Sequence, residues 1–185
     1  MTKTPNLEQA EVRAAQQNRA DFAPLYQRYA DAVYGYCFRR LSDPEQAADV
    51  TAEVFTKAMA TIATFSGNSF RSWLFTIARN AVIDRYRARK PVEVLPETLV
   101  STDPGPEEIA IRRETHLELR AALTHLTEQQ QDVITLRLAG LTGKEIAAAM
   151  ELTPGAVKAT QVRAFARLRE LMTPHVTLQK EGDRV

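Results

Sequence analysis

Apolar residues recur every three or four positions along most of the chain, which is the period of an amphipathic helix. Three stretches in the first half share this spacing: 21–41, 44–64 and 70–89. Asp43 is placed to cap the second of them, and Pro91 ends the third, because the residue before a proline disfavours helical backbone. The segment 65–69 interrupts the pattern and predicts a loop. We therefore predict a three-helix module over 21–90, preceded by a polar, partly helical extension over 1–20.

The second half of the chain also has a helical pattern, and its helix ends are marked by capping residues. The stretch 107–125 has helical periodicity. Thr127 then begins a new helix, with Gln130 at the position that completes a capping box. That helix is predicted to end near Ala139, with Gly140 as its C-terminal cap. Because no segment predicts a β-strand, the pattern favours an all-α fold.

Two further helices lie between positions 141 and 172, separated by a very short turn. Thr142 and Glu145 form a second capping box, and Thr153 caps the last helix just ahead of a proline. A turn this short makes the two helices cross steeply, which is the geometry of a helix-turn-helix. From 154 to 169 the last helix has no acidic residue and four basic ones: Lys158, Arg163, Arg167 and Arg169. A basic helix of this kind is expected to face phosphates.

Charge is unevenly distributed, although the net charge of the 185 residues is only +1. The stretch 70–90 holds six cationic residues against one acid, whereas 91–108 holds five acids and no base. Four prolines and a glycine lie within 91–106, a composition typical of an extended linker. We predict an all-α protein of two small helical modules joined by a flexible acidic linker, the C-terminal module containing the helix-turn-helix.

Two stretches have the composition of nucleic-acid-binding surfaces. On the last helix, the positions predicted to face away from the module are Gly155, Lys158, Ala159, Val162 and Arg163. The inward stripe of the same helix is predicted to hold Val157, Gln161, Ala164, Leu168 and Leu171. In the stretch 70–90, cations alternate with aromatic residues, as expected where unpaired bases stack and a backbone is neutralised. The alternative for this stretch is an amphipathic helix with aromatic residues such as Trp73 in the core and arginines in solvent.

Several classes of site are excluded by composition. Cys37 is the only cysteine, so an intramolecular disulfide and a multi-cysteine metal site are impossible, and the three histidines fit no metal spacing. Asp49 and Glu53 form a carboxylate pair, but nothing nearby supplies a third metal ligand or an oxyanion donor. With no catalytic motif and no expected cofactor, an enzyme is the least favoured class. The absence of a bilayer-spanning apolar run and of a signal peptide predicts a cytoplasmic protein without membrane insertion.

Three motifs together resemble the extracytoplasmic-function (ECF) type of bacterial RNA polymerase sigma factor. They read DPEQAADVTAEVF, FRSWLFTIARNAVIDRYRAR and LTGKEIAAAMELTPGAVKATQVRAFARLREL, in the family's order. The resemblance implies sigma region 2 over 21–90, a linker over 91–106, region 4 over 107–173 and a tail over 174–185. It also implies a function, namely binding to the clamp and flap of the polymerase core and promoter-specific initiation through melting of the −10 element and recognition of the −35 element.

The resemblance assigns residues to these tasks. Positions that match contacts to the polymerase core are Asp49, Ala52 and Glu53. Positions that match contacts to the −10 element are Ser66, Asn68, Phe70, Arg71, Trp73, Arg79, Asn80, Asp84, Arg85 and Arg87. Positions that match contacts to the −35 element are Arg137, Lys144, Thr153, Gly155, Lys158, Ala159, Val162 and Arg163. RNA polymerase core and promoter DNA are the expected partners, which implies association with the nucleoid in holoenzyme, and an anti-sigma factor that sequesters the protein at the membrane is a candidate third partner.

Three departures from the family pattern change what is expected. Ala52 replaces the usual glutamine, which predicts a weaker or compensated contact to the core. Glu151 stands where many such turns have glycine, which predicts either backbone strain or a turn of different geometry. The triplet 159–161 reads Ala-Thr-Gln instead of Ser-Arg-Leu, which predicts a lost phosphate contact at Thr160 and an unusual −35 preference.

Two alternatives remain open at the level of sequence. A transcriptional regulator that used only the helix-turn-helix would bind duplex DNA without a polymerase, but Trp73 and Arg79 in the first module argue against it. An adaptor or decoy of sigma-like shape would bind protein alone, but such a protein has no need of basic residues such as Lys158 and Arg163. The sequence specifies neither the promoter, nor the inducing signal, nor whether an anti-sigma factor binds.

Overall fold

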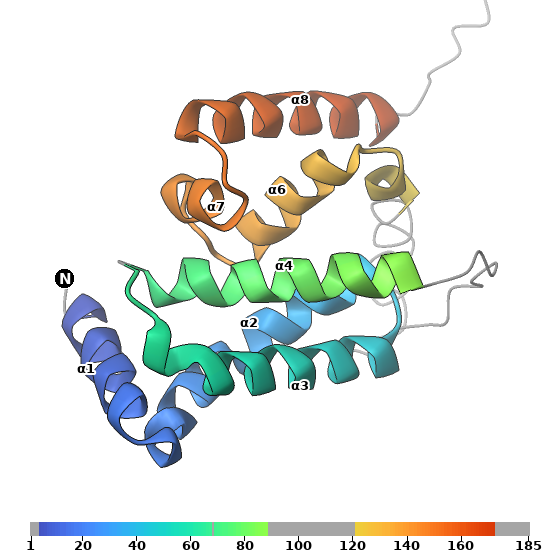
Figure 1. Ribbon diagram of the computed structural model, residues 1–185. Helices are drawn as coiled ribbons and strands as arrows, with labels where there is room; N and C mark the ends of the chain where they lie inside the picture. The colour runs from blue at the N-terminus through green and yellow to red at the C-terminus, as the bar shows by residue number, and fades with distance from the viewer. Residues whose placement is uncertain (1–3, 68, 89–120, 173–185) are drawn as a thin grey trace, which may run out of the picture.

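A computed structural model describes residues 4–67, 69–88 and 121–172, and all regular structure within these ranges is helical (Figure 1). The first module contains α1 (Thr4–Gln17), η1 (Arg19–Phe22), α2 (Ala23–Leu41), α3 (Pro44–Thr61), η2 (Ile62–Thr64) and α4 (Phe70–Ala88). The second module contains α6 (Glu128–Leu138), α7 (Gly143–Ala149) and α8 (Pro154–Met172). The predicted all-α fold class is therefore confirmed. The linker 91–106, the stretch 107–120 and the tail 174–185 lie outside the described residues.

The first module is built on α2, α3 and α4, which pack against one another through apolar stripes. Fully buried side chains on these stripes include Leu25, Val33, Val50, Val54, Leu74 and Phe75. The predicted cap of α3 is present, because the Asp43 carboxylate accepts a hydrogen bond of 2.9 Å from the backbone N–H of Gln46. The loop after η2 lets α4 begin at Phe70, which turns the chain back across α3.

The N-terminal extension forms a helix that is fastened to the first module. Val12 and Ala15 of α1 are buried in the core, and Gln16 donates hydrogen bonds to the carbonyl oxygens of Ile62 and Phe65 at 3.2 and 2.7 Å. The Tyr29 hydroxyl also donates to Glu8, at 2.6 Å. The sequence predicted a partly helical extension but not this role, which is to hold the loop that leads into α4.

The second module is assembled from capped helices, as predicted. Both capping boxes form: Thr127 with Gln130 at the start of α6, and Thr142 with Glu145 at the start of α7. Thr153 also accepts a 3.1 Å hydrogen bond from a backbone N–H in the first turn of α8. The turn between α7 and α8 requires a left-handed residue, and Glu151 supplies it with a φ of 55°. The structure therefore has the backbone strain at Glu151 that was one of the two predicted outcomes.

The two modules pack on each other, which the sequence did not predict. In Figure 1, α4 lies between the α2–α3 layer and the helices of the second module, and it contacts α7 while α2 contacts α6. One continuous core includes Leu74 and Phe75 of the first module together with Leu136 and Ile146 of the second. The expectation of two modules joined by a flexible linker did not anticipate this contact.

Candidate nucleic-acid interfaces

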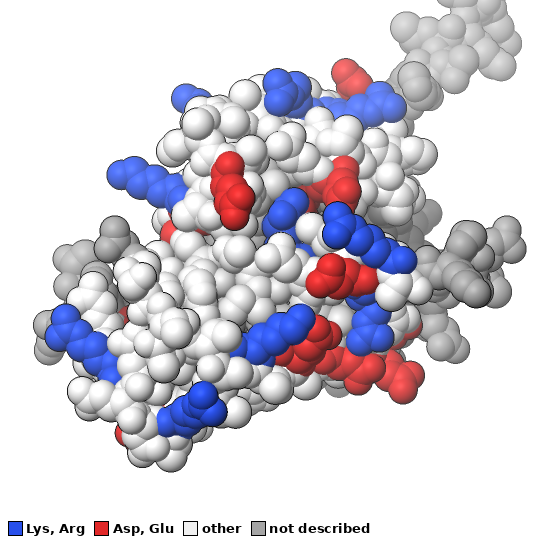
Figure 2. Space-filling view, viewed as in Figure 1, with Lys and Arg blue, Asp and Glu red and all other residues white. Residues whose placement is uncertain are grey.

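The helix-turn-helix presents a basic face on α8. The five positions predicted to face outward are all exposed: Gly155, Lys158, Ala159, Val162 and Arg163. The inward face holds Val157, Ala164 and Leu168, all of them buried. Figure 2 shows lysine and arginine side chains along this uppermost helix, whereas acidic side chains gather over α3 below it. The helix therefore offers cations to a ligand without competing acids in its first four turns.

The prediction for the centre of α8 was wrong at two adjacent residues. Thr160 is 3% exposed and occupies the buried face, so it is not a position from which an arginine would reach a phosphate. Gln161 is half-buried and does not replace a core leucine. The helical phase places residues 157, 160, 164 and 168 on the core side, which is the pattern that spacing of three and four residues produces. The expected loss of a phosphate contact at Thr160 therefore does not follow.

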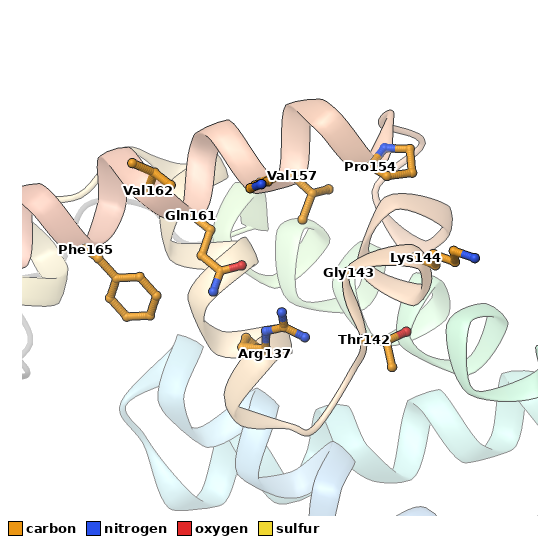
Figure 3. A pocket seen from close by; sticks show the side chains of 10 residues that line it. Arg137, Thr142, Gly143, Lys144, Pro154, Val157, Gln161, Val162 and Phe165 are labelled. Carbon is orange, nitrogen blue, oxygen red and sulfur yellow. The ribbon is translucent and has the colours of Figure 1, made fainter.

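An open groove of about 690 Å³ runs between α8 and the segment from α6 to α7 (Figure 3). Val157, Val162 and Phe165 line it from α8. Arg137 and Lys144, two further residues assigned by resemblance to the −35 element, line its other side. Arg137 also donates a 3.0 Å hydrogen bond to the carbonyl oxygen of Leu141, which fixes its side chain beside the groove. The groove therefore combines an apolar floor with cationic edges.

The aromatic residues at the start of α4 belong mainly to the core. Phe70 is only 3% exposed and lies edge-on to Phe22 and Phe65. Trp73 is half-buried and stacks at a tilt against Phe65 and Phe70, with ring centroids 5.1 and 5.4 Å apart. Ser66 is exposed in the preceding loop, and Asn68 lies outside the described residues. The expectation that Trp73 is partly core is confirmed, and the exposed part of its ring is what remains for a ligand.

Two of the arginines assigned to the −10 element contact the second module. Arg71 donates a 2.8 Å hydrogen bond to the carbonyl oxygen of Ala139, and Arg79 donates one of 2.8 Å to the carboxylate of Asp132. Gly140 is favoured beside Arg71 because its φ of +86° is left-handed, and a Cβ there would lie 2.7 Å from the Arg71 guanidinium, which would have to shift. On the same helix, Asn80, Asp84 and Arg87 are exposed, and Arg85 is half-buried at 4.0 Å from Asp49.

Asp132 is the centre of a buried ionic cluster that sequence reasoning missed. Its side chain is fully buried and is held by three side chains of the first module, namely Arg79, Arg40 and Tyr36. The Nε atom of Arg40 lies 3.2 Å from Oδ1 without hydrogen-bond geometry, so this contact is an ion pair, while the Tyr36 hydroxyl lies 3.4 Å from the same oxygen. Burial, reinforced by the Asp132 charge, raises the pKa of Tyr36, which keeps its hydroxyl protonated as a donor.

Arg40 contacts residues of both modules. Its guanidinium donates to Gln131 of α6 and lies 5.5 Å from the ring centroid of Tyr86, whose hydroxyl donates to the Arg40 carbonyl oxygen. A sequence signal for this cluster did exist, because Asp132 falls on the same helical stripe as Leu136 and Ala139. A carboxylate on an apolar stripe requires a partner, and an arginine is the usual one.

The face of α3 assigned to the polymerase core is exposed and acidic. Asp49 and Ala52 are exposed, and Glu53 is partly exposed and paired with Lys57 at 2.6 Å. Within the described ranges, no group of three or more histidine, cysteine, aspartate or glutamate side chains is arranged to hold a metal ion. Of the helices described, none is both long and apolar enough to cross a membrane.

Both modules match known protein families. The family described as Sigma-70 region 2 matches residues 25–92, and the family described as Sigma-70, region 4 matches residues 116–168. The chain is 37% identical to the ECF RNA polymerase sigma factor BldN of Streptomyces coelicolor over 87% of this chain and 64% of that protein. It is 30% identical to the ECF RNA polymerase sigma factor SigX of Bacillus subtilis over 88% of this chain and 93% of that protein.

Solved structures show the same arrangement of helices. A structure of CnrH in complex with the cytosolic domain of CnrY has a TM-score of 0.69 and 25% identity, covering 88% of this chain and 94% of CnrH. The sigma factor RpoE of Bartonella quintana, solved with the anti-sigma factor NepR, has a TM-score of 0.61 and 24% identity over 82% of this chain and 96% of that one. At 24% identity, the likeness to RpoE shows only a shared fold.

Proposed function

Because this chain belongs to the extracytoplasmic-function (ECF) family of RNA polymerase sigma factors, we propose that it binds the polymerase core and directs promoter-specific transcription initiation. In this proposal the polymerase performs the chemistry, and this chain supplies no catalytic group. Its contribution is binding free energy used to select a promoter and open it. The observation that carries this proposal is the outward face of α8, where Lys158 and Arg163 are exposed and form no ion pair with any described residue, beside a cation-edged groove.

Recognition of the −35 element is assigned to the second module. Lys158 and Arg163 are long enough to reach base edges or phosphates in a major groove, and the exposed methyl groups of Ala159 and Val162 suit contacts to thymine. Arg137 and Lys144 lie where they can hold the adjacent backbone. Because Thr160 is buried, the sequence preference depends on the small residues 155 and 159 and not on a missing arginine.

Melting of the −10 element is assigned to α4 and the loop before it. Ser66 and the exposed part of Trp73 are placed to receive an unpaired base, which repays part of the cost of unstacking it. Asn80 and Arg87 are exposed further along the helix and suit the duplex edge and its phosphates. Arg71 and Arg79 join this surface only when they are released from the second module.

The polymerase core is expected to bind the exposed acidic face of α3. Asp49 and Glu53 lie one turn apart and offer carboxylates to a basic surface, and Ala52 between them presents only a methyl group. The likeness to CnrH, solved with the cytosolic domain of CnrY, supports a protein partner of this chain as well, and we propose that this partner is an anti-sigma factor. Such an anti-sigma factor would sequester the chain from the polymerase.

Reconstitution tests this function directly. The purified chain is combined with bacterial core polymerase and transcribed on a pooled promoter library, and open complexes are mapped with permanganate. Core-dependent start sites with reactive thymines near −10 are expected, and they would define the promoter in the same experiment. Binding to duplex DNA without any dependence on core would overturn the proposal in favour of a helix-turn-helix regulator, and binding to neither, with the cognate polymerase as core, would point to an adaptor.

A further inference from the structure

We propose that Gln16, near the end of α1, is a positioning residue for opening of the −10 element. Its side-chain amide holds the backbone at Phe65, and Phe65 in turn sets how the exposed part of Trp73 meets an unpaired base. The contact with a base rests on the function proposed above. The link from Gln16 to Trp73 is a property of the free chain and can be tested without a polymerase.

The amide of Gln16 spans the single turn of η2. Its Nε2 atom donates hydrogen bonds to the carbonyl oxygens of Ile62 at 3.2 Å and Phe65 at 2.7 Å. Because both partners are acceptors, the amide nitrogen with its two hydrogens, and not the amide oxygen, must face them. The carbonyl oxygen of Ile62 also accepts the backbone N–H of Phe65 at 3.0 Å. Gln16 therefore fixes both ends of this turn, and with them the direction in which the chain leaves Phe65.

Phe65 passes this constraint to Trp73 by direct ring contact. The Phe65 ring lies perpendicular to Phe70 at a centroid distance of 5.9 Å and at a tilt against Trp73 at 5.1 Å. A Cβ added at Gly67 would lie only 2.8 Å from the Phe65 ring, so the backbone at Gly67 also lies close to it. With neighbours on these sides, a shift of the Phe65 backbone must move the ring against which Trp73 packs.

Other contacts keep α1 in place when the Gln16 side chain is changed. Val12 is buried in the core, and the Glu8 carboxylate accepts a 2.6 Å hydrogen bond from Tyr29. The ring of Tyr29 lies 5.7 Å from that of Phe70, so α1 supports the aromatic cluster from a second direction. A substitution of Gln16 should therefore alter the position of Phe65 without undocking α1.

The position of Trp73 matters because only part of its ring is available. The side chain is half-buried, so an unpaired base can stack on the exposed part alone. A ring that is held in its orientation before DNA arrives needs no further ordering when the base is captured. Loss of the Gln16 amide would thus weaken capture of the base without removing any group that touches it.

Trp73 is the only tryptophan, so its fluorescence tests the link in the free chain. Gln16→Met keeps the length of the side chain but loses both donors, and Gln17→Met at the exposed neighbouring position is its matched control. We expect Gln16→Met to shift the emission to longer wavelength and to increase quenching by acrylamide, with unchanged far-UV circular dichroism. Gln17→Met should behave as the native chain. Identical emission and quenching in the two variants would overturn the proposal.

The variant Gln16→Lys separates lost hydrogen bonds from lost packing. Lysine is similar to methionine in length, but its ammonium group can donate to both carbonyl oxygens. These oxygens lie at the end of a helix, where a cation is favoured. We therefore expect Gln16→Lys to restore the native emission and quenching. Equal behaviour of Gln16→Lys and Gln16→Met would assign the effect to packing and would refute a role for the amide.

The holoenzyme tests the consequence for DNA, on a promoter recovered from the pooled library. In a template whose −10 region is already unpaired, each base of the non-template strand is replaced in turn by an abasic site. With the native chain and with Gln17→Met, one such site should weaken binding about tenfold, as expected for loss of one stacked base. With Gln16→Met the same site should cost less than about twofold, because the stacking is already impaired. An undiminished penalty in Gln16→Met would contradict the proposal.

The two experiments fail independently of each other. If the native chain opens no promoter with its cognate core, the sigma-factor function is refuted, and capture of a base is refuted with it. The fluorescence still decides whether Gln16 positions Trp73 in that case. If promoters open but the fluorescence of Trp73 is unaffected by Gln16→Met, only this inference is refuted.

Discussion

Replacing Asp132 with alanine is expected to destabilise the protein by about 3 kcal/mol, because it leaves a cation buried without its counter-charge. The Arg40 side chain is only 3% exposed and loses its ion pair. Removal of one partner from a buried pair typically costs about 3–5 kcal/mol. The lower end applies because Arg40 keeps its hydrogen bond to Gln131, and because Arg79 is exposed enough to be hydrated again.

The free energy of docking between the two modules sets an upper limit on this loss of stability. Separation of the modules would expose Arg40 to water, so the loss of stability cannot exceed the free energy of docking. Urea denaturation should therefore be followed with two probes: fluorescence of Trp73, the only tryptophan, which reports the first module, and far-UV circular dichroism, which reports all helices. We expect coincident curves for the native chain and separated curves for Asp132→Ala, with the second module unfolding at lower urea.

A charge-free double variant is the control for this reasoning. Arg40→Met with Asp132→Leu removes both ions, and with them the desolvation penalty, so it should recover at least half of the loss caused by Asp132→Ala. A loss of less than about 1 kcal/mol for Asp132→Ala would be the value of a solvent-exposed pair. That result, or a double variant less stable than the single one, would refute a buried ionic cluster between the modules.

Three further predictions concern other parts of the chain. Lys158→Ala should lower the holoenzyme's preference for its −35 sequence about tenfold in competition binding. The control is Arg167→Ala on the same helix, which should leave that preference unchanged because Arg167 is paired with Glu170 at 3.1 Å. Glu151→Gly should raise stability by about 0.5 kcal/mol in thermal unfolding, because glycine adopts the φ of 55° without a Cβ clash. The pKa of the Cys37 thiol is raised to about 11, so the thiolate forms only as the pH approaches that value. At neutral pH, Cys37 should therefore react with a disulfide reagent far more slowly in the native chain than in urea. Equal reaction rates in the two conditions would contradict the burial of Cys37.

Local structure was predictable from the sequence wherever a short-range signal specified it. The capping residues Asp43, Thr127 and Thr142 fixed the starts of three helices, and each makes the predicted hydrogen bond. Glu151 was singled out by resemblance instead, because it stands where many turns of this motif carry glycine, and its φ of 55° is left-handed. Helical phase was less secure, and an error of one residue exchanged Thr160 and Gln161 between the core and the groove.

Long-range pairing was not predictable in this way. Nothing in the stretch around Arg71 indicates that its partner is the carbonyl oxygen at Ala139, 68 positions away. The sequence predicted that the cations of α4 bind a nucleic acid, but a sequence does not specify whether the anion that a guanidinium meets is a phosphate or a carboxylate of the same chain, such as Asp132 at Arg79. Asp132 carried the missing signal, because a charged residue on an apolar helical stripe predicts a buried counter-charge.

The same physical property would allow α4 to bind either anion. A guanidinium forms comparable charge-assisted bonds with a carboxylate and with a phosphate, so Arg79 needs no change of structure to exchange one for the other. The apolar residues that flank it are different, because Leu74 and Phe75 are fully buried in the core and have no role on an open DNA-binding surface. The specificity of docking therefore depends on the second module, whose Asp132 pairs with Arg40 and Arg79 of the first. A substitution at Asp132 should therefore weaken the docking of the two modules while leaving unchanged the residues that are proposed to contact DNA.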